Sequence, residues 1–275
     1  TSAFPEIKSD VINFLKIRAG YGTSANFPFG YPISATLNLD TQSFIKNGGY
    51  VISNTSGSVL GNPNLKPERI DEIEFGVEGR FLNNRLRMDL SIYNKKTNDL
   101  IIDRPLDPST GYTLTKTNIG LIENKGIELD LSMDWIQSNE GINLSTSLNW
   151  STNDAIVIDL GEDTDRIVYA GFGTLGNAAI PGESLGSIIG SSITRSGATI
   201  EASRWVGGDG GLVVNNQGSY DETFDPTIIG DANPDWIANI SNNVSYKNSS
   251  LNFLFNFQAG GDIYSTTVAT LLGRG

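Results

Sequence analysis

The side chains in this sequence that could carry out catalysis are acidic. The chain contains no histidine and no cysteine, which excludes Ser-His-Asp hydrolysis, histidine general bases, thiolate metal sites and disulfides. Two acidic pairs, Asp163 with Asp165 and Glu201 with Asp209, have the side chains that a glycosidase uses as acid and nucleophile. Acidic loop residues are common, however, and no surrounding motif positions these pairs. An enzyme is therefore the least favoured class of function.

The Gly-rich stretch over residues 205–211 could be a calcium loop or a plain Gly-rich turn. It contains a single carboxylate, Asp209, whereas calcium prefers six to eight oxygen ligands. The next acidic residues, Asp221, Glu222 and Asp225, follow at irregular spacing. The sequence therefore predicts no metal site and no cofactor.

Aromatic side chains in the long connections are the candidates for binding chemistry. An aromatic ring can stack on a sugar ring or pack against an apolar side chain. The candidate substrate contacts are Tyr31, Tyr112, Phe172 and Trp205. These rings could equally pack one loop on another or against a partner protein, and that alternative stays open.

Charge and hydropathy restrict the possible partners. Lys plus Arg number 19 and Asp plus Glu number 31, so the net charge is −12. An acidic chain without a basic patch argues against nucleic acid, whose phosphates must be neutralised on binding. No apolar run approaches the roughly 20 residues of a membrane helix. Strands of a membrane β-barrel alternate apolar with polar residues and keep the average hydropathy low, so hydropathy alone does not separate a soluble from a membrane protein.

Three predicted β-hairpins position the long connections, and the first is the best specified. Apolar and polar residues alternate along residues 72–81 and again along 85–93, on either side of the turn Asn83-Asn84. This register puts Phe81 opposite Leu86, Val77 opposite Leu90 and Phe75 opposite Ile92 on an apolar face. The other face pairs Arg80 with Arg87 and Glu78 with Asp89, with opposite charges meeting on the diagonals.

The other predicted strands follow the same period of two. A second hairpin joins residues 127–135 and 142–150 around residues 138–141 and pairs Leu129 with Leu148. A third joins 239–246 and 251–258 around 247–250 and pairs Ile240 with Phe257. Two weaker strands are predicted between 184 and 206, turning near Ser196-Gly197, and one strand at 11–21, which makes nine in total. A small hairpin is expected at Asn47-Gly48-Gly49, inside the first long connection.

These features together favour an all-β fold, an antiparallel transmembrane β-barrel segment of about nine strands that forms an incomplete barrel. The strands run about 11 to 15 residues, whereas soluble strands usually have about 5–6. Short turns alternate with long connections at residues 22–66, 100–117, 155–183 and 207–233, as periplasmic turns and extracellular loops do. Alternation alone would also suit a soluble β-sandwich, so that alternative stays open.

Several collinear motifs carry a family resemblance. They are Gly61-Asn62-Pro63-Asn64-Leu65-Lys66-Pro67-Glu68, Asn124-Lys125-Gly126-Ile127-Glu128, Gly230-Asp231-Ala232-Asn233-Pro234-Asp235-Trp236 and Gly260-Gly261-Asp262-Ile263-Tyr264. In this order they resemble the TonB-dependent receptors of the bacterial outer membrane, specifically the SusC/RagA-like branch. Pro63 and Pro67 also restrict the backbone just before strand pairing is expected to begin.

The resemblance implies that residues 1–275 form the C-terminal part of a barrel of roughly 22 strands, with the plug domain not present in this chain. It further implies active import of a glycan or peptide oligomer, energised by TonB through the plug. The implied partners are a SusD-like surface lipoprotein and the lipid bilayer, with no nucleic acid. The alternatives are a passive porin, a surface adhesin barrel, or a soluble extracellular glycan-binding β-domain.

Overall fold

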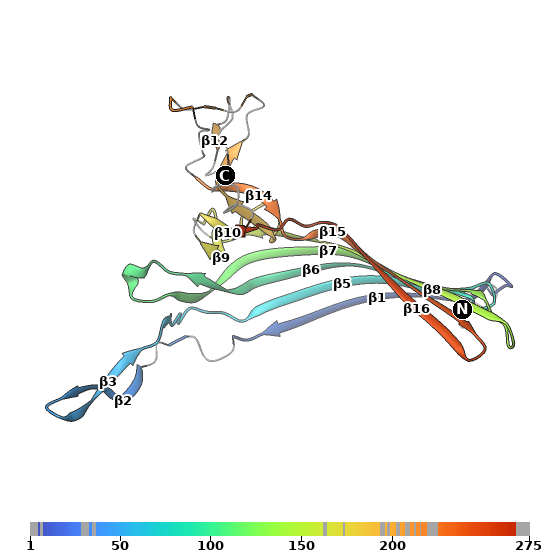
Figure 1. The fold of residues 1–275 in the computed structure, drawn as a ribbon, viewed down its shortest axis with the longest axis horizontal. Coiled ribbons are helices and arrows are strands. Elements are labelled where there is room, and N and C mark those ends of the chain that lie inside the picture. Colours follow the sequence, from blue (N-terminus) through green and yellow to red (C-terminus); the bar gives the residue numbers. More distant parts are fainter. Residues whose placement is uncertain are drawn as a thin grey trace.

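The computed structural model describes residues 5, 8–28, 33–34, 37–161, 164–172, 174–192, 196, 199–201, 204–206, 210–211, 213–214, 216–218 and 225–267. Within these residues the chain is built almost entirely from β-strands (Figure 1). Among the described residues, no helix is long and apolar enough to cross a membrane.

Seven long strands form one curved antiparallel sheet, which runs across the whole of Figure 1. They are β1 (Ile12–Asn26), β5 (Glu68–Phe81), β6 (Leu86–Pro105), β7 (Leu114–Ile136), β8 (Ile142–Asp159), β15 (Pro234–Tyr246) and β16 (Ser249–Gly260). They pair in the order β1-β5-β6-β7-β8-β15-β16. The two-residue strand β4 (Val59–Leu60) pairs in parallel with the start of β7, at Leu114 and Thr115. The all-β, antiparallel prediction is confirmed.

One face of this sheet, the apolar face, is predominantly apolar from the first strand to the last. Its polar exceptions include Thr146 and Asn242, which share a hydrogen bond of 2.7 Å. A single line of directly paired residues crosses all seven strands: Ile17, Val77, Leu90, Leu129, Trp150, Ala238 and Phe257. Because successive side chains point to opposite sides of a strand, the neighbouring line lies on the other face. That polar face carries Lys16, Glu78, Asp89, Asp130, Asn149, Asn239 and Asn256.

The first predicted hairpin is confirmed pair by pair. Phe81 lies opposite Leu86 and Glu78 opposite Asp89. Asn83 and Asn84 adopt positive φ angles of 59° and 63°, a conformation that asparagine tolerates better than most residues. The turn residues therefore fix the register of the whole hairpin.

The second and third hairpins differ from the prediction by two residues in register. Leu148 pairs with Leu131 rather than Leu129. Beside the turn, Ile136 pairs with Leu144, three residues from the predicted register, and a bulge between Asp134 and Ile136 reduces this difference to two. Ile240 pairs with Phe255 rather than Phe257, because the turn contains two residues, 247–248, and not four. A shift of two keeps every side chain on its predicted face, since only an odd shift exchanges the faces.

The prediction of nine barrel strands is wrong: two of the nine do not belong to the long sheet. Residues 187–190 instead form β11 (Ser187–Gly190) in a separate sheet of order β14-β11-β10-β9, with β9 (Ile167–Phe172), β10 (Leu175–Ala179) and β14 (Thr227–Asp231). Residues 199–206 form a small hairpin of β12 (Thr199–Glu201) and β13 (Arg204–Val206). All four residues of β11 are buried, unlike a wall strand that exposes one face. With or without these two strands, short turns alternate with long connections along the chain. This alternation therefore could not show that the predicted strand count was wrong.

The connections at the other end of the sheet are shorter than predicted because the strands extend into them. Strand β6 continues to Pro105 and β7 starts at Leu114, with the 3-10 turn η2 (Pro108–Thr110) between them. The small predicted hairpin is confirmed as β2 (Leu37–Lys46) and β3 (Gly49–Ser56), which pairs Ile45 with Tyr50 around Asn47 and Gly48. It projects away from the long sheet in Figure 1.

Candidate functional site

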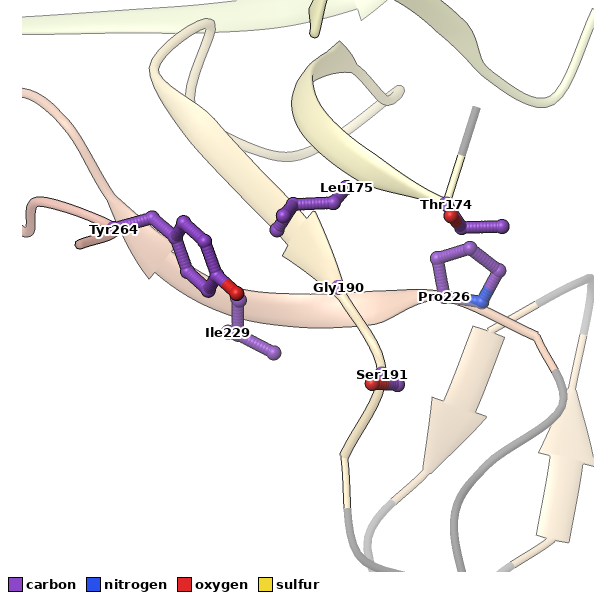
Figure 2. Close-up of a pocket in the computed structure, with 7 residues that line it drawn as sticks. All are labelled: Thr174, Leu175, Gly190, Ser191, Pro226, Ile229 and Tyr264. Carbon is purple, nitrogen blue, oxygen red and sulfur yellow. The ribbon is translucent and has the colours of Figure 1, made fainter. Parts of the chain in front are cut away.

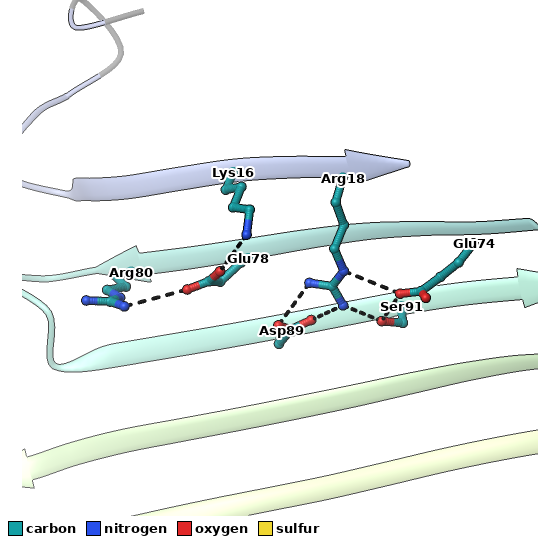
Figure 3. A network of polar contacts seen from close by, with 7 residues as sticks. All are labelled: Lys16, Arg18, Glu74, Glu78, Arg80, Asp89 and Ser91. Atoms are coloured by element: carbon teal, nitrogen blue, oxygen red, sulfur yellow. Dashed lines mark hydrogen bonds and ion pairs between the residues drawn. The ribbon is translucent and has the colours of Figure 1, made fainter. Parts of the chain in front are cut away.

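Arg18 anchors a network of polar contacts on the polar face (Figure 3). Its guanidinium reaches from β1 across β5 to β6, where Nη1 and Nη2 donate to the two carboxylate oxygens of Asp89 at 3.0 and 2.7 Å. Nη2 also donates to Ser91 Oγ at 2.5 Å, and Nε donates to Glu74 Oε1 at 3.3 Å. Gly76 lies beneath this side chain: a Cβ atom there would sit 2.3 Å from Arg18 Nε. A glycine therefore allows the arginine to lie flat across the middle strand.

The network resolves the like charges that the register brings together. Asp89 lies directly between Glu78 and Asp130 on the adjacent strands. Arg18 neutralises Asp89, while Lys16 and Arg80 approach Glu78 at 3.8 and 3.6 Å. The prediction placed the opposite charges on the diagonals of the β5–β6 hairpin. The structure differs, because the main counter-charge for Asp89 is Arg18 on β1. Arg18 had not been singled out, although its place between Ile17 and Ala19 already puts it on the polar face.

A second side chain crosses a strand in the same way. Tyr93 on β6 lies over Gly126 on β7, where an added Cβ atom would meet the tyrosine oxygen at 2.3 Å. Its hydroxyl donates to Asn153 Oδ1 on β8 at 3.1 Å. Arg18 and Tyr93 thus tie together all five strands from β1 to β8 along the polar face.

The polar face changes character between β7 and β8. Residues 142–151, 236–246 and 249–258, which form most of β8, β15 and β16, contain no charged side chain. Asparagine and serine take their place, as in the bonds of Ser132 with Ser147, at 3.0 Å, and of Asn243 with Asn252. One half of the polar face is therefore ionic and the other half is neutral and rich in amides and hydroxyls.

The apolar face ends at a definite height along the strands. On β5 the apolar positions extend over about nine residues, from Ile73 to Phe81, which is close to the 9–11 residues a tilted strand needs to cross a bilayer. The next positions on this face are polar, with Asp71 on β5, Asn94 on β6 and Lys125 on β7. Strand β7 has 23 residues, so about half of it extends beyond the apolar band.

The proline motif is fixed to this extension of β7. The side chain of Asn118 accepts a hydrogen bond from the Lys66 backbone N–H at 2.8 Å and donates to the Lys66 carbonyl at 2.9 Å. Asn62 donates to the Lys116 carbonyl at 2.9 Å. The segment that leads into β5 therefore crosses β6 and is held on β7, which gives the motif a structural role.

The sheet of β9, β10, β11 and β14 packs against the outer ends of β6, β7 and β8. Its shared core consists of Ile119, Ile122, Val157, Leu160, Ile167 and Ala179. Backbone bonds continue the packing: Val157 N–H donates to the Glu183 carbonyl at 3.0 Å, and Leu185 N–H to the Ala155 carbonyl at 2.8 Å. The hydroxyl of Tyr169 donates to the Leu185 carbonyl, and burial raises the pKa of Tyr169. We call this four-stranded unit the loop sheet. It packs against the long sheet on the side that carries Ile122, Ala155 and Val157.

The loop sheet carries a cavity of about 340 Å³ (Figure 2). The residues around it are Thr174, Leu175, Gly190, Ser191, Pro226, Ile229 and Tyr264. They come from β10, β11, β14 and the segment that follows β16, which are distant in sequence. Tyr264, at the end of a motif already singled out for its resemblance, was not among the predicted substrate contacts.

The predicted site residues are distributed over several loops. Tyr112 is half-buried in the connection between β6 and β7. Phe172 ends β9, and Trp205 is the middle residue of β13, paired with Ile200. Tyr31 lies outside the described residues, as do Asp163 and Asp209. Within the described part of the chain, no group of three or more acidic residues could hold a metal ion. The substrate contacts stay a prediction.

Comparison with known proteins gives a consistent picture. Residues 9–267 match the family model described as TonB dependent receptor-like, beta-barrel. TonB-dependent receptor P26 of Formosa agariphila is 30% identical over 267 residues, which covers 91% of this chain and 26% of the relative. TonB-dependent receptor SusC of Bacteroides thetaiotaomicron is 26% identical over 168 residues, covering 59% of this chain and 17% of the relative. The chain thus spans about a quarter, or less, of the length of these relatives.

Solved structures agree on the fold. The structure of the RagAB peptide transporter superposes with a TM-score of 0.68 at 23% identity, covering 92% of this chain and 27% of that chain. At this level of identity the likeness shows the fold, namely consecutive strands of a SusC/RagA-like barrel.

Proposed function

This chain belongs to the TonB-dependent receptor-like β-barrel family of the outer membrane, and on that premise we propose that it forms one sector of a transporter for active nutrient import. Its seven long strands supply the barrel wall, and the connections beyond Pro105 and Asp159 supply extracellular loops. The energy arrives through TonB, which acts on a plug domain outside this chain.

The observation that carries the proposal is the uncovered apolar face. Ile17, Phe75 and Leu251 expose 75%, 59% and 61% of their surface, and among the described residues no second layer of sheet or helix lies over them (Figure 1). A soluble β-sandwich would bury this face against another sheet. Lipid is the solvent that stabilises a continuous apolar band of this height.

The polar face supports the assignment of the lumen. In a membrane barrel the side opposite lipid is polar and faces water or a plug. The charges of β1 to β7 suit a hydrated interior that contacts the plug, and the loop sheet stands at the outer end of the same wall. A SusD-like lipoprotein that covers the extracellular side completes the proposed assembly.

The proposed substrate is an oligomer of a nutrient, either a glycan or a peptide. The structural neighbour RagAB is a peptide transporter by its title, and the relatives of higher identity are named only as receptors. Both chemistries suit a wide barrel whose loops carry aromatic residues.

Uptake in cells that produce the complete receptor tests the proposal. Growth on the cognate oligomer should require the receptor and should stop when TonB is inactivated. Purified receptor in planar bilayers should show no steady ion conductance, because the plug closes the lumen. Open conductance together with uptake that persists without TonB would establish the porin alternative instead.

A further inference from the structure

We propose that the cavity on the loop sheet binds one uncharged sugar ring of a glycan substrate. This names the substrate class of the transporter and rests on the proposed import function. The binding step itself is independent of energy, since it takes place on the extracellular side.

The position of the cavity fits a first contact with an incoming molecule. Strand β14 leads into β15 through residues 232–233, and Tyr264 follows β16 through Gly260-Gly261. The cavity therefore lies where this pair of wall strands ends, opposite the two-residue turn at 247–248. Asp231 and Asp262 hold the two segments together, through a bond from Asp231 N–H to Asp262 Oδ2 at 2.9 Å. The aromatic wall is thus fixed to the loop sheet before any ligand arrives.

The shape of the cavity depends on a glycine. Gly190 lies at its floor, and an added Cβ atom would meet Ile229 Cδ1 at 2.6 Å and Leu175 Cδ1 at 3.3 Å. The two aliphatic side chains therefore pack directly against the Gly190 backbone, and a side chain at this position would displace two of the residues that line the cavity (Figure 2). Its volume is near the lower end of the roughly 300–1,000 Å³ of small-molecule sites, which suits one unit of a polymer.

The lining has the two properties that a neutral sugar requires. The ring of Tyr264 is 44% exposed and bounds the cavity at one end, where it offers an apolar surface to the C–H face of a sugar ring. The hydroxyls of Thr174 and Ser191 border the cavity elsewhere (Figure 2). No described residue forms a side-chain hydrogen bond with either hydroxyl, so both are available to the hydroxyl groups of a ligand.

The same lining disfavours the other ligand classes. None of the described residues that line the cavity is charged. Arg166, which donates to the carbonyl of the lining residue Pro226 at 3.3 Å, is not itself among them, so an acidic sugar would find no ion-pair partner in the described lining. An apolar side chain of a peptide would cover the hydroxyls of Thr174 and Ser191 without bonding them, which carries a desolvation cost.

Binding of the purified complete receptor to an array of neutral oligosaccharides, uronic-acid oligosaccharides and apolar hexapeptides tests the proposal. Neutral oligosaccharides should bind preferentially. Titration calorimetry should show that Tyr264→Ala weakens the best of them by about tenfold, the range expected for losing an aromatic contact. Ile229→Trp, which fills the cavity from a side chain that is 42% exposed, should weaken it at least as much. The matched control is Ile263→Ala, next to Tyr264 in the chain but 92% exposed, which should leave binding unchanged.

The outcomes separate this inference from the import function. If no neutral oligosaccharide binds, if peptides or uronic-acid oligosaccharides bind in preference, or if Tyr264→Ala and Ile229→Trp both bind normally, the cavity is not a sugar site. In each of these cases TonB-dependent uptake can still be intact. Normal binding of neutral oligosaccharides by a receptor whose uptake ignores TonB would instead overturn the import function and leave the sugar site standing.

Discussion

A charge placed at the middle of the apolar face should strongly destabilise the barrel, whereas the same charge one residue further along should not. Phe255 and Asn256 are consecutive residues of β16 on opposite faces of the sheet, paired with Ile240 and Asn239 respectively. Phe255 lies midway along β16, and Leu251 lies near the two-residue turn at 247–248. The substitutions Phe255→Arg, Asn256→Arg and Leu251→Arg therefore test face and depth separately.

The expected magnitudes follow from the position of each residue. An arginine that faces lipid at the bilayer midplane costs about 2–4 kcal/mol, and one near the interface costs about 0–1 kcal/mol. Phe255→Arg should thus lower the folding equilibrium constant roughly 30- to 1,000-fold, since about 1.4 kcal/mol corresponds to a factor of ten. Leu251→Arg should have a small effect. Asn256→Arg should be nearly neutral, because it joins a hydrated polar face.

Reversible unfolding of the complete receptor by guanidinium in phospholipid vesicles measures these differences. Phe255→Ala provides the reference for loss of the ring, so that the comparison of Arg with Ala isolates the charge. If Phe255→Arg and Asn256→Arg were equally tolerated, the apolar face would not touch lipid and the transporter assignment would fail. Equal costs at Leu251 and Phe255 would contradict the predicted height of the band.

Four further predictions concern the polar face and the loops. Gly76→Ala should displace Arg18 and destabilise the wall, whereas the control Gly20→Ala, whose new carbon meets nothing within 4 Å, should be neutral or stabilise by about 0.4–1 kcal/mol; unfolding in vesicles compares them. Ile119→Ala should cost about 2–5 kcal/mol and Ile119→Val about 0.5–1.5 kcal/mol, and limited proteolysis should detect the loosened loop sheet between residues 164 and 231 in that order. Asn118→Ala removes its bonds to the Lys66 and Asp99 backbones, so residues 57–67 should become the preferred cleavage site while the wall stays protected. Because burial raises the pKa of Tyr169, the unfolded state ionises first, and the loop sheet should lose stability as the pH rises above about 10; hydrogen exchange should show this loss in the native receptor and not in Tyr169→Phe.

The wall could be predicted from sequence because two local signals agree there. In the hairpin of β5 and β6 the alternation of residues 73–81 defines the faces, and the turn Asn83-Asn84 defines the register. In the other two hairpins the turn sequence did not specify the register, so the faces were right and the pairs were wrong. The alternation of apolar and polar residues determines which face of the sheet a side chain lies on. Only a turn of specific sequence determines which residue it pairs with on the next strand.

The loop sheet could not be predicted from the sequence, because its strands do not alternate apolar with polar residues as the wall strands do. Strand β11 reads Ser-Ile-Ile-Gly and is buried on both sides, so alternation says nothing about it. Its partners are set by contacts distant in sequence, such as that of Ile189 with Ile228. The cavity is harder still to predict, since it depends on the close packing of Ile229 and Leu175 against Gly190, and its aromatic wall, Tyr264, follows a different strand pair.

The division of the polar face into a charged and a neutral half bears on the route that a substrate would take from the cavity along the wall. The charged half, over β1 to β7, is tied together by Arg18 and Tyr93, which lie flat across Gly76 and Gly126. The neutral half, over β8, β15 and β16, begins at the strands that end beside the cavity. A polymer of uncharged sugar units that leaves the cavity would therefore meet asparagine and serine groups, which exchange hydrogen bonds with hydroxyls without requiring a counter-ion. An acidic polymer would meet no fixed cation along residues 142–151, 236–246 and 249–258, so this part of the wall favours an uncharged polymer.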